Sequence, residues 1–199
     1  MRYSQNNEED IIIEFFKDKK SGFFIEIGSY HPFVFSNVRK LHENGWGGVM
    51  IEPSDRCFES LLREYENTEN ITLIKKAVIV EENVEEITFY DYNGDAISTT
   101  NFQHTLKWHE KFNETKVKTI SLNKLLEQYG NLCDFINIDV ELTNYELFSN
   151  LPDWFLNRIS LICIEHDNRY EDIEKTLERF NFIRLLLNSE NIIMGRKNN

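Results

Sequence analysis

The fold is decided by the stretch Gly22-Phe23-Phe24-Ile25-Glu26-Ile27-Gly28, a short apolar run between two glycines. Its apolar and aromatic residues predict a buried strand over residues 23–27. The turn that follows reads Ser29-Tyr30-His31-Pro32, and Pro32 suits an early position in a helix that ends near Gly45. A strand, a glycine turn and a helix in this order indicate an α/β domain.

Segments with helical and with strand-like periodicity alternate along the whole chain, as they do in α/β proteins. At 199 residues the chain is long enough for one buried core, so we predict a single domain over residues 1–199. We predict a mostly parallel sheet with an antiparallel C-terminal strand. Strands are expected at residues 23–27, 48–51, 71–80, 86–90, 134–138 and 159–164, with a closing hairpin at 182–187 and 192–194. Helices are expected at residues 8–17, 32–45, 55–65, 121–130, 145–151 and 171–180.

The segment 93–118 is polar, aromatic and only weakly periodic. It is long for a loop in a compact domain, so it is either a functional lid or a helix that the pattern hides. We expect an inserted lid with some helix near residues 105–112. Its side chains His104, Trp108 and His109 either contact an acceptor or pack the loop down.

The charge balance excludes some partners. The chain has 34 acidic and 22 basic residues, a formal net charge of -12, which repels the phosphate backbone of nucleic acids. No apolar run approaches the ~20 residues of a membrane span. The polar residues 1–7 lack the layout of a signal peptide, so we predict a cytoplasmic protein without a membrane segment.

The cysteines do not indicate a disulfide framework or a zinc site. Cys57, Cys133 and Cys163 are odd in number and far apart, whereas such sites need paired and closer spacing. Cys133 and Cys163 lie in apolar strand-like runs, which favours buried and inert thiols.

Four acidic residues follow the predicted strands. Glu26, Glu52, Asp139 and Glu165 each lie at or just beyond the carboxyl end of one of them. In an open parallel sheet these ends share one edge, and ligands bind there. Like charges at one edge repel each other unless a ligand or bound cations neutralise them, so the pattern favours a cationic ligand. The alternative is a row of solvated loop acids.

The turn at residues 28–32 indicates which kind of ribose-containing ligand the edge would bind. Glu52 follows Gly28 at nearly the ~20-residue spacing of the acid that binds a ribose diol in Rossmann-type units. A dinucleotide also needs a glycine-rich turn for its pyrophosphate, but only one glycine is present here, and no P-loop motif occurs. S-adenosylmethionine (SAM) has no phosphate. Its sulfonium, ammonium and ribose diol all suit carboxylates.

Several motifs of the chain occur in the same order in one known protein family. The motifs are Ser4-Gln5 with Glu9-Asp10, the stretch 22–28, His31-Pro32, Ser36-Asn37, residues 45–53, residues 118–122, residues 134–141 and Ile164-Glu165. In this ordered set, and over nearly its whole length, the chain resembles the FkbM family of SAM-dependent methyltransferases.

The resemblance implies a Rossmann-like class I methyltransferase fold with SAM as cofactor. It also implies O-methylation, often of sugars or natural products. The family usually has alanine where Ser29 stands and glycine where Leu142 stands, so the turn after strand 134–138 differs here. We predict that the cofactor-binding residues are Glu26, Gly28, Ser29, Tyr30, Glu52, Pro53, Ala77 and Asp139.

Methyl transfer is an in-line displacement on a carbon that the sulfonium already activates, so the enzyme mainly aligns donor and acceptor. A hydroxyl acceptor must also lose its proton to a general base. The candidate bases are Asp139, Glu141, His31 and His166. Asp139 has an alternative role in binding the methionine ammonium or an edge of the adenosine, and Glu141 has one in capping the next helix.

The acids also raise the question of a metal. Asp139, Glu141, Glu165 and His166 form a grouping that suits a divalent cation. The family resemblance does not require one, so we predict no metal.

We therefore predict a SAM-dependent methyltransferase that acts on the hydroxyl of a small molecule or carbohydrate. One alternative is a SAM-binding module without turnover. This alternative is favoured by Tyr30 and Leu142, which stand where glycine would be expected. Another is a methyltransferase for amine or protein acceptors, where a general base matters less. Nucleic acid is the least suitable acceptor because of the charge.

Overall fold

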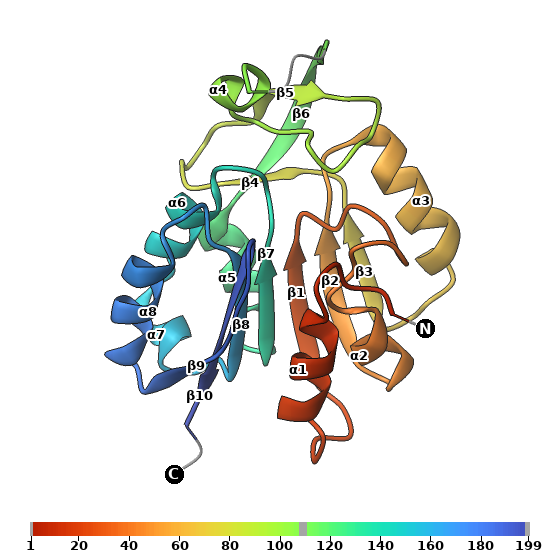
Figure 1. Ribbon diagram of the computed structural model, residues 1–199. Helices are drawn as coiled ribbons and strands as arrows, with labels where there is room; N and C mark the ends of the chain where they lie inside the picture. Colours follow the sequence, from red (N-terminus) through yellow and green to blue (C-terminus); the bar gives the residue numbers. More distant parts are fainter. Residues whose placement is uncertain (1, 108–110, 198–199) are drawn as a thin grey trace.

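The computed structural model describes residues 2–107 and 111–197 (Figure 1). A seven-stranded sheet runs through it in the order β3-β2-β1-β7-β8-β10-β9. All neighbours are parallel except β10, which is antiparallel to β8 and β9. The predicted fold class is thereby confirmed. The strands are β1 (Phe23–Ile27), β2 (Gly47–Ile51), β3 (Ile71–Ile74), β7 (Phe135–Ile138), β8 (Leu161–Glu165), β9 (Phe182–Leu187) and β10 (Asn191–Arg196).

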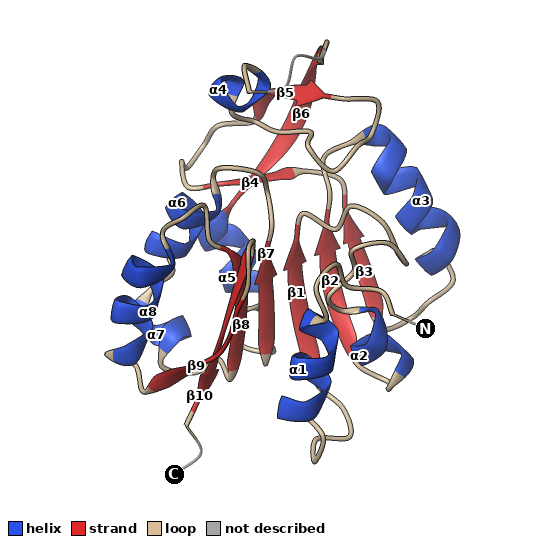
Figure 2. Ribbon diagram, in the orientation of Figure 1, coloured by secondary structure: helices blue, strands red, loops and turns tan. Residues whose placement is uncertain are grey.

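Helices cover both faces of this sheet (Figure 2). On one face Ile12, Leu41 and Leu61 pack against Phe24 and Met50, so α1, α2 and α3 share that side. Apolar residues of α5, α6, α7 and α8 pack on the other face against Ile25, Ile27, Ile136 and Ile138. The helices are α1 (Glu8–Phe15), α2 (Arg39–Glu43), α3 (Asp55–Tyr65), α5 (Leu122–Tyr129), α6 (Asn144–Ser149), α7 (Asp153–Leu156) and α8 (Tyr170–Glu178).

A second sheet of three strands lies across the carboxyl edge of the first (Figure 1). Its order is β4-β6-β5, with β4 (Ala77–Ile79) parallel and β5 (Glu86–Asp91) antiparallel to β6 (Asn113–Ser121). The short helix α4 (Phe102–Thr105) belongs to the same region. We call this region, residues 77–121, the cap.

The cap corrects two predictions. The strand expected at 71–80 is two strands in different sheets, because the chain leaves the main sheet at Lys75-Lys76. The loop expected at 93–118 is partly strand, since residues 113–121 form β6. Most of the first six residues of β6 are exposed, so no apolar alternation marked it as a strand. Helix within this segment is at 102–105 rather than at 105–112.

The helix expected to begin at Pro32 is also wrong. Only residues 39–43 are helical, and the chain before them is a loop. In this loop His31 Nδ1 accepts hydrogen bonds from the backbone N–H groups of Phe33 and Val34, at 3.1 and 3.2 Å. A helix that began at Pro32 would leave these two N–H groups without a partner, so the bonds resemble a helix cap. Phe35, however, has φ 59°, a left-handed conformation that a right-handed helix cannot contain, so the chain turns here instead.

Other local predictions hold. The helix at 55–65 is confirmed to the residue, and Ser121 caps α5 by accepting a hydrogen bond from Lys124 N. The closing hairpin is confirmed as β9 and β10. All three cysteines are free and buried. No helix within the described ranges is long and apolar enough to cross a membrane.

Candidate functional site

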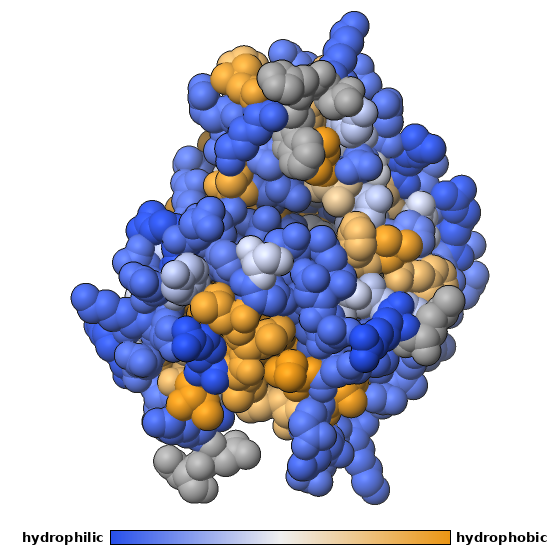
Figure 3. Space-filling view, in the orientation of Figure 1, coloured by the Kyte–Doolittle hydropathy of each residue, from blue (hydrophilic) through white to orange (hydrophobic). Residues whose placement is uncertain are grey.

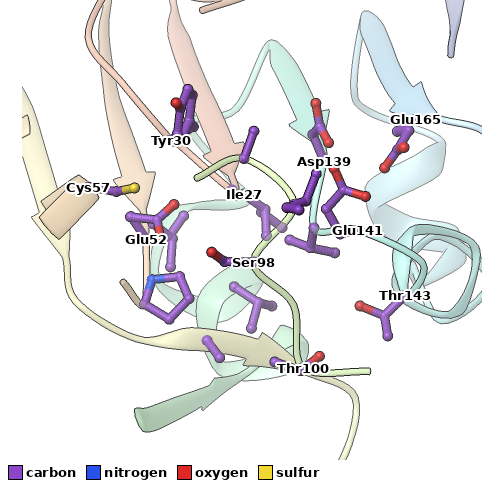
Figure 4. A pocket seen from close by; sticks show the side chains of 18 of the residues that line it. Ile27, Tyr30, Glu52, Cys57, Ser98, Thr100, Asp139, Glu141, Thr143 and Glu165 are labelled. Atoms are coloured by element: carbon purple, nitrogen blue, oxygen red, sulfur yellow. The ribbon is translucent and has the colours of Figure 1, made fainter. Parts of the chain in front are cut away.

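A cavity of about 400 Å³ lies at the carboxyl edge of the main sheet, under the cap (Figure 4). The sheet side contributes the residues that follow β1, β2, β7 and β8, while the cap contributes β4 and the segment 95–100. The predicted edge therefore forms one wall of a cavity. From the sheet side the lining includes Gly28, Tyr30, Glu52, Pro53, Asn137, Asp139, Glu141 and Glu165, and from the cap Ala77, Val78, Phe89 and residues 95–98.

The turn after β1 is closed by backbone packing. Gly28 has φ 88°, and a Cβ at this position would lie 1.7 Å from the carbonyl oxygen of Asp139. Only glycine allows this left-handed conformation and this approach of the two turns together. The N–H groups of Gly28 and Ser29 both donate to the carbonyl oxygen of Ile51, which fixes the turn against β2.

Glu52 lies directly after β2, and its side chain projects into the cavity (Figure 4). Its carboxylate accepts a hydrogen bond from Ser54 N at 2.8 Å. Burial raises the pKa of Glu52 to about 7. A buried carboxylate with one oxygen held in this way is suited to accept hydrogen bonds from a ligand's hydroxyl groups.

Glu26 lies below the cavity rather than on its wall. It is 3% exposed, it is not among the lining residues, and its Oε2 has no hydrogen-bond partner among the described residues. Burial raises the pKa of Glu26 to about 8, which favours a protonated side chain at neutral pH. Glu26 thus differs from the other acids of the predicted edge, which do line the cavity.

Three carboxylates meet at the other end of the cavity. One oxygen each of Asp139, Glu141 and Glu165 lies within 4.8 Å of the others. Asn144 connects this group to its surroundings, because its Nδ2 donates to Glu165 Oε2 at 2.6 Å and its Oδ1 accepts from Val140 N at 2.7 Å. Figure 4 shows the three carboxylates on the opposite side of the cavity from Glu52.

The three groups raise each other's proton affinity. Burial is the largest cause of the upward pKa shift in Asp139, Glu141 and Glu165, and repulsion from neighbouring carboxylates adds to it. Carboxyl groups this close share protons at neutral pH rather than ionise independently. Oxygens at this spacing also suit a divalent cation. That no metal is needed stays a prediction.

The turn that carries Glu141 is strained. Glu141 and Leu142 have φ of 55° and 68°, the left-handed region that side chains rarely adopt. Thr99 Oγ1, from the cap, holds the turn by donating to the Glu141 carbonyl oxygen at 2.9 Å. Strain of this kind persists only where surrounding contacts enforce it, and it gathers at functional sites.

A family model supplies the decisive comparison. The model described as the methyltransferase FkbM domain matches residues 26–192. The chain belongs to the FkbM methyltransferase family. The predictions of this family, of its Rossmann-like class I methyltransferase fold and of SAM as cofactor are thereby confirmed. No curated protein sequence matches the chain.

Solved structures with similarity to this FkbM domain share little sequence with it. The fibrillarin pre-rRNA processing protein of Methanococcus jannaschii is 14% identical, with a TM-score of 0.43 over 89% of this chain and 67% of that one. The methyltransferase PaMTH1 of Podospora anserina, bound to S-adenosylhomocysteine (SAH), is 13% identical, with a TM-score of 0.44 over 98% and 80%. The N-methyltransferase NodS of Bradyrhizobium japonicum is 8% identical, with a TM-score of 0.45 over 96% and 94%.

The two histidines predicted as bases lie outside the cavity lining of this FkbM domain. The Nδ1 atom of His31 is engaged by the backbone of its own loop, and burial lowers the pKa of its ring. His166 Nδ1 accepts from Asn168 N at 3.0 Å, and its Nε2 lies 3.3 Å from the carbonyl oxygen of Asn188. Both rings support local backbone structure, which leaves the carboxylates as the bases nearest to a ligand.

His104 lies closer to the carboxylates than either predicted histidine. It is 4% exposed in α4, and its Nε2 is 3.6 Å from Glu141 Oε2. Burial lowers the pKa of His104, so the ring is neutral near pH 7. The cap thus brings a buried imidazole against the wall of the site. Trp108 and His109, named with His104 as lid residues, lie outside the described residues.

Sequence reasoning missed several lining residues. Those of the cap, residues 95–98, carried no pattern that marked them. Gln5 lies far from Glu190 and Asn191 in sequence, and the three line the cavity together only in the fold. For Gln5 a signal existed, since Ser4-Gln5 is one of the family-like motifs.

Proposed function

We propose that this chain transfers a methyl group from SAM to a hydroxyl group of a small-molecule or carbohydrate acceptor. The observation that carries the proposal is one cavity with Glu52 on one side and Asp139, Glu141 and Glu165 on the other. The first side suits a ribose diol, and the second suits proton removal beside a cation. A volume of about 400 Å³ falls in the range of small-molecule sites.

The residues around Glu52 fit the nucleoside part of the cofactor. Pro53, Ala77 and Val78 give an apolar wall next to the Glu52 carboxylate, as an adenine ring next to a ribose requires. Gly28, whose N–H donates to the Ile51 carbonyl oxygen next to Glu52, also lines the cavity, so its backbone can approach the same ligand. SAM, when bound here, supplies a methyl group already activated by its sulfonium.

The carboxylates on the far side would act on the acceptor. The acceptor oxygen forms a bond to the methyl carbon while the carbon–sulfur bond breaks, SAH leaves, and the hydroxyl proton passes to a carboxylate. A base is most effective when its pKa lies near the working pH, and burial and repulsion raise the pKa values of these three groups in that direction. Glu141 is the base we assign, because burial first and then repulsion from Glu165 and Asp167 raise its pKa.

A second candidate acceptor is an amine. The same three carboxylates would attract an ammonium group, and a net charge of -12 adds to that attraction. Nucleic acid remains the least suitable acceptor, because a net charge of -12 repels its phosphate backbone. An alcohol and an amine are separated by the need for a base, since a neutral amine attacks without losing its proton first.

Cofactor binding is tested by thermal unfolding with SAH. A ligand at 100 times its dissociation constant stabilises by about 2.7 kcal/mol, so a clear rise of Tm is expected. Glu52→Gln should lose most of that rise while its own Tm without ligand stays at or above that of the wild type, because the buried charge is removed. Glu59→Gln is the matched control, because Glu59 is an exposed glutamate in α3, the helix that follows Glu52. If millimolar SAH does not change the Tm of the wild-type protein, the cavity is not the cofactor site.

Turnover is tested by SAH release from SAM with panels of sugars, nucleotide sugars and amines. Glu141→Gln should lower kcat for an alcohol by about 10²–10⁴-fold, the usual contribution of a general base, with little change in SAM affinity. If only amines are methylated and Glu141→Gln retains activity, the second candidate is correct. Binding of SAM without SAH release from any acceptor would instead identify a binding module.

A further inference from the structure

The segment 3–6 ahead of α1, which we call the strap, lies against the turn between β9 and β10. Gln5 Nε2 donates to Glu190 Oε1 at 3.1 Å, and Asn6 Nδ2 donates to Glu190 Oε2 at 3.2 Å. Both carboxylate oxygens of Glu190 are therefore engaged by the strap. Gln5 and Glu190 line the cavity, whereas Asn6 does not. The strap lies before residues 26–192, so the family match says nothing about it.

Two fully buried glutamates hold the strap in place. Glu8, which is 0% exposed, accepts hydrogen bonds from Asn6 N at 2.8 Å and from Asn188 Nδ2 at 2.7 Å. It also accepts from Asn191 Nδ2 at 3.0 Å, so one carboxylate joins the strap to the hairpin turn.

Glu9 is equally buried and holds the start of the strap. It accepts from Tyr3 N at 2.9 Å and pairs with Lys40 Nζ at 3.0 Å. A buried charge is costly unless it is hydrogen-bonded, so two such groups around four residues indicate that the position of the strap matters. Helix capping alone does not account for the bonds to the hairpin.

The position of the strap relative to the site indicates what it binds. If the ribose lies at Glu52, the amino-acid end of the cofactor extends past Gly28 toward β7. There the cavity is lined by Asn137, Gln5 and Asn191. Asn37 Nδ2 donates to Asn137 Oδ1 at 3.0 Å, so the amide nitrogen is the end of Asn137 that remains for a ligand.

An α-amino acid is a zwitterion, and its recognition needs donors for the carboxylate beside acceptors for the ammonium. Gln5 and Asn137 carry amide donors, while Glu190 and Asp139 are carboxylates that line the same part of the cavity. We propose that the strap completes the cofactor site, with Gln5 donating to the carboxylate of the amino-acid end and Glu190 accepting from its ammonium. This inference rests on the proposed function.

The test compares SAH with 5′-methylthioadenosine, which has the same nucleoside and no amino-acid end. Affinities are measured by calorimetry on the full chain. Gln5→Ala should weaken SAH by about tenfold, the effect of losing a hydrogen bond to a charged group, and leave 5′-methylthioadenosine unchanged. Glu190→Gln should behave in the same way. Tm values without ligand verify that each variant is folded.

Asn6→Ala is the matched control, because Asn6 donates to the same Glu190 carboxylate without lining the cavity. It should alter SAH affinity by less than about twofold. Equal losses for Gln5→Ala and Asn6→Ala, or equal losses for both ligands, would overturn the inference and reduce the strap to a structural element. Unchanged SAH binding by Gln5→Ala would also overturn it. If the wild type binds neither ligand, both the proposed function and the inference about the strap are wrong.

Discussion

The turns after β1 and β7 touch each other, and both need left-handed backbone, which glycine provides in one and residues with side chains provide in the other. Both contain left-handed residues: Gly28 with φ 88° in the first, and Glu141 and Leu142 with φ 55° and 68° in the second. At Gly28 there is no room for a Cβ, because the backbone of Asp139 fills that space. The turn after β7 keeps two side chains in a conformation that normally favours glycine.

The difference separates packing from chemistry. Gly28 is required by sterics alone, since any side chain would meet the neighbouring turn. Glu141 is kept in a strained conformation although glycine would fit it, because its carboxylate lines the cavity beside Asp139 and Glu165. Strain at the second turn therefore accompanies a carboxylate of the cavity wall, whereas the first turn, which has glycine, is relaxed.

The largest effect should come from Gly28→Ala. The new Cβ would displace the turn after β7, and we expect a loss of about 3–5 kcal/mol in the free energy of unfolding. Gly45→Ala measures the conformational cost alone, because Gly45 also has φ 88° but nothing lies within 4 Å of its Cβ position. It should cost only about 1 kcal/mol. The difference between the two variants is then the cost of the contact between the turns. Chemical denaturation measures both, and equal losses would mean that contact between the turns is unimportant.

A smaller effect concerns the buried acid before the first turn. The folded pKa of Glu26, about 8, exceeds the ~4.3 of an unfolded glutamate, so folding favours the protonated form. Its stabilising effect is complete below pH ~4 and is lost as the pH rises toward 8, by at most about 1.4 kcal/mol per pH unit. Glu26→Gln should make the decline of stability between pH 5 and 8 less steep. An unchanged slope would show that Glu26 ionises freely, and Glu59→Gln is the exposed control.

The smallest effect should come from Leu142→Gly. Glycine relieves the left-handed strain, which destabilises the folded state by about 1–2 kcal/mol. Against this, the variant loses the packing of a half-buried leucine, and its unfolded chain has a higher conformational entropy. We expect Tm to rise by a few degrees at most, with SAH release retained. Asn181→Gly, at φ 66°, should change little because asparagine tolerates this region. A clear fall of Tm would show that Leu142 packing outweighs the strain.

Much of the fold could be predicted because its signals are local. The strand at 23–27 and the helix at 55–65 carry apolar patterns that packing did not override. The strand at 113–121 could not be found, because its exposed first residues, 113–116, are all polar and its pairing with β4 and β5 is set by tertiary structure. Pro32 misled because Phe35, three residues later, has the left-handed φ of 59° that interrupts a helix, and no glycine marks that position in the sequence.

The site divides in the same way. Glu52 and Asp139 could be placed from the rule that acids after parallel strands share an edge. The rule could not tell that Glu26, one residue before its strand's end, lies beneath the cavity. Nor could it bring Gln5 to Glu190, since that contact depends on how the hairpin folds back over α1.

The burial of every thiol has a practical consequence for spectroscopy. Cys57, Cys133 and Cys163 are all buried, and burial raises the pKa of each, that of Cys57 to about 12. Alkylating dyes react with accessible thiolates, so the native protein should remain nearly unlabelled. A single cysteine introduced at an exposed position, such as Glu59, would then be the one fluorophore site, and distances from it can be followed without first removing the natural cysteines.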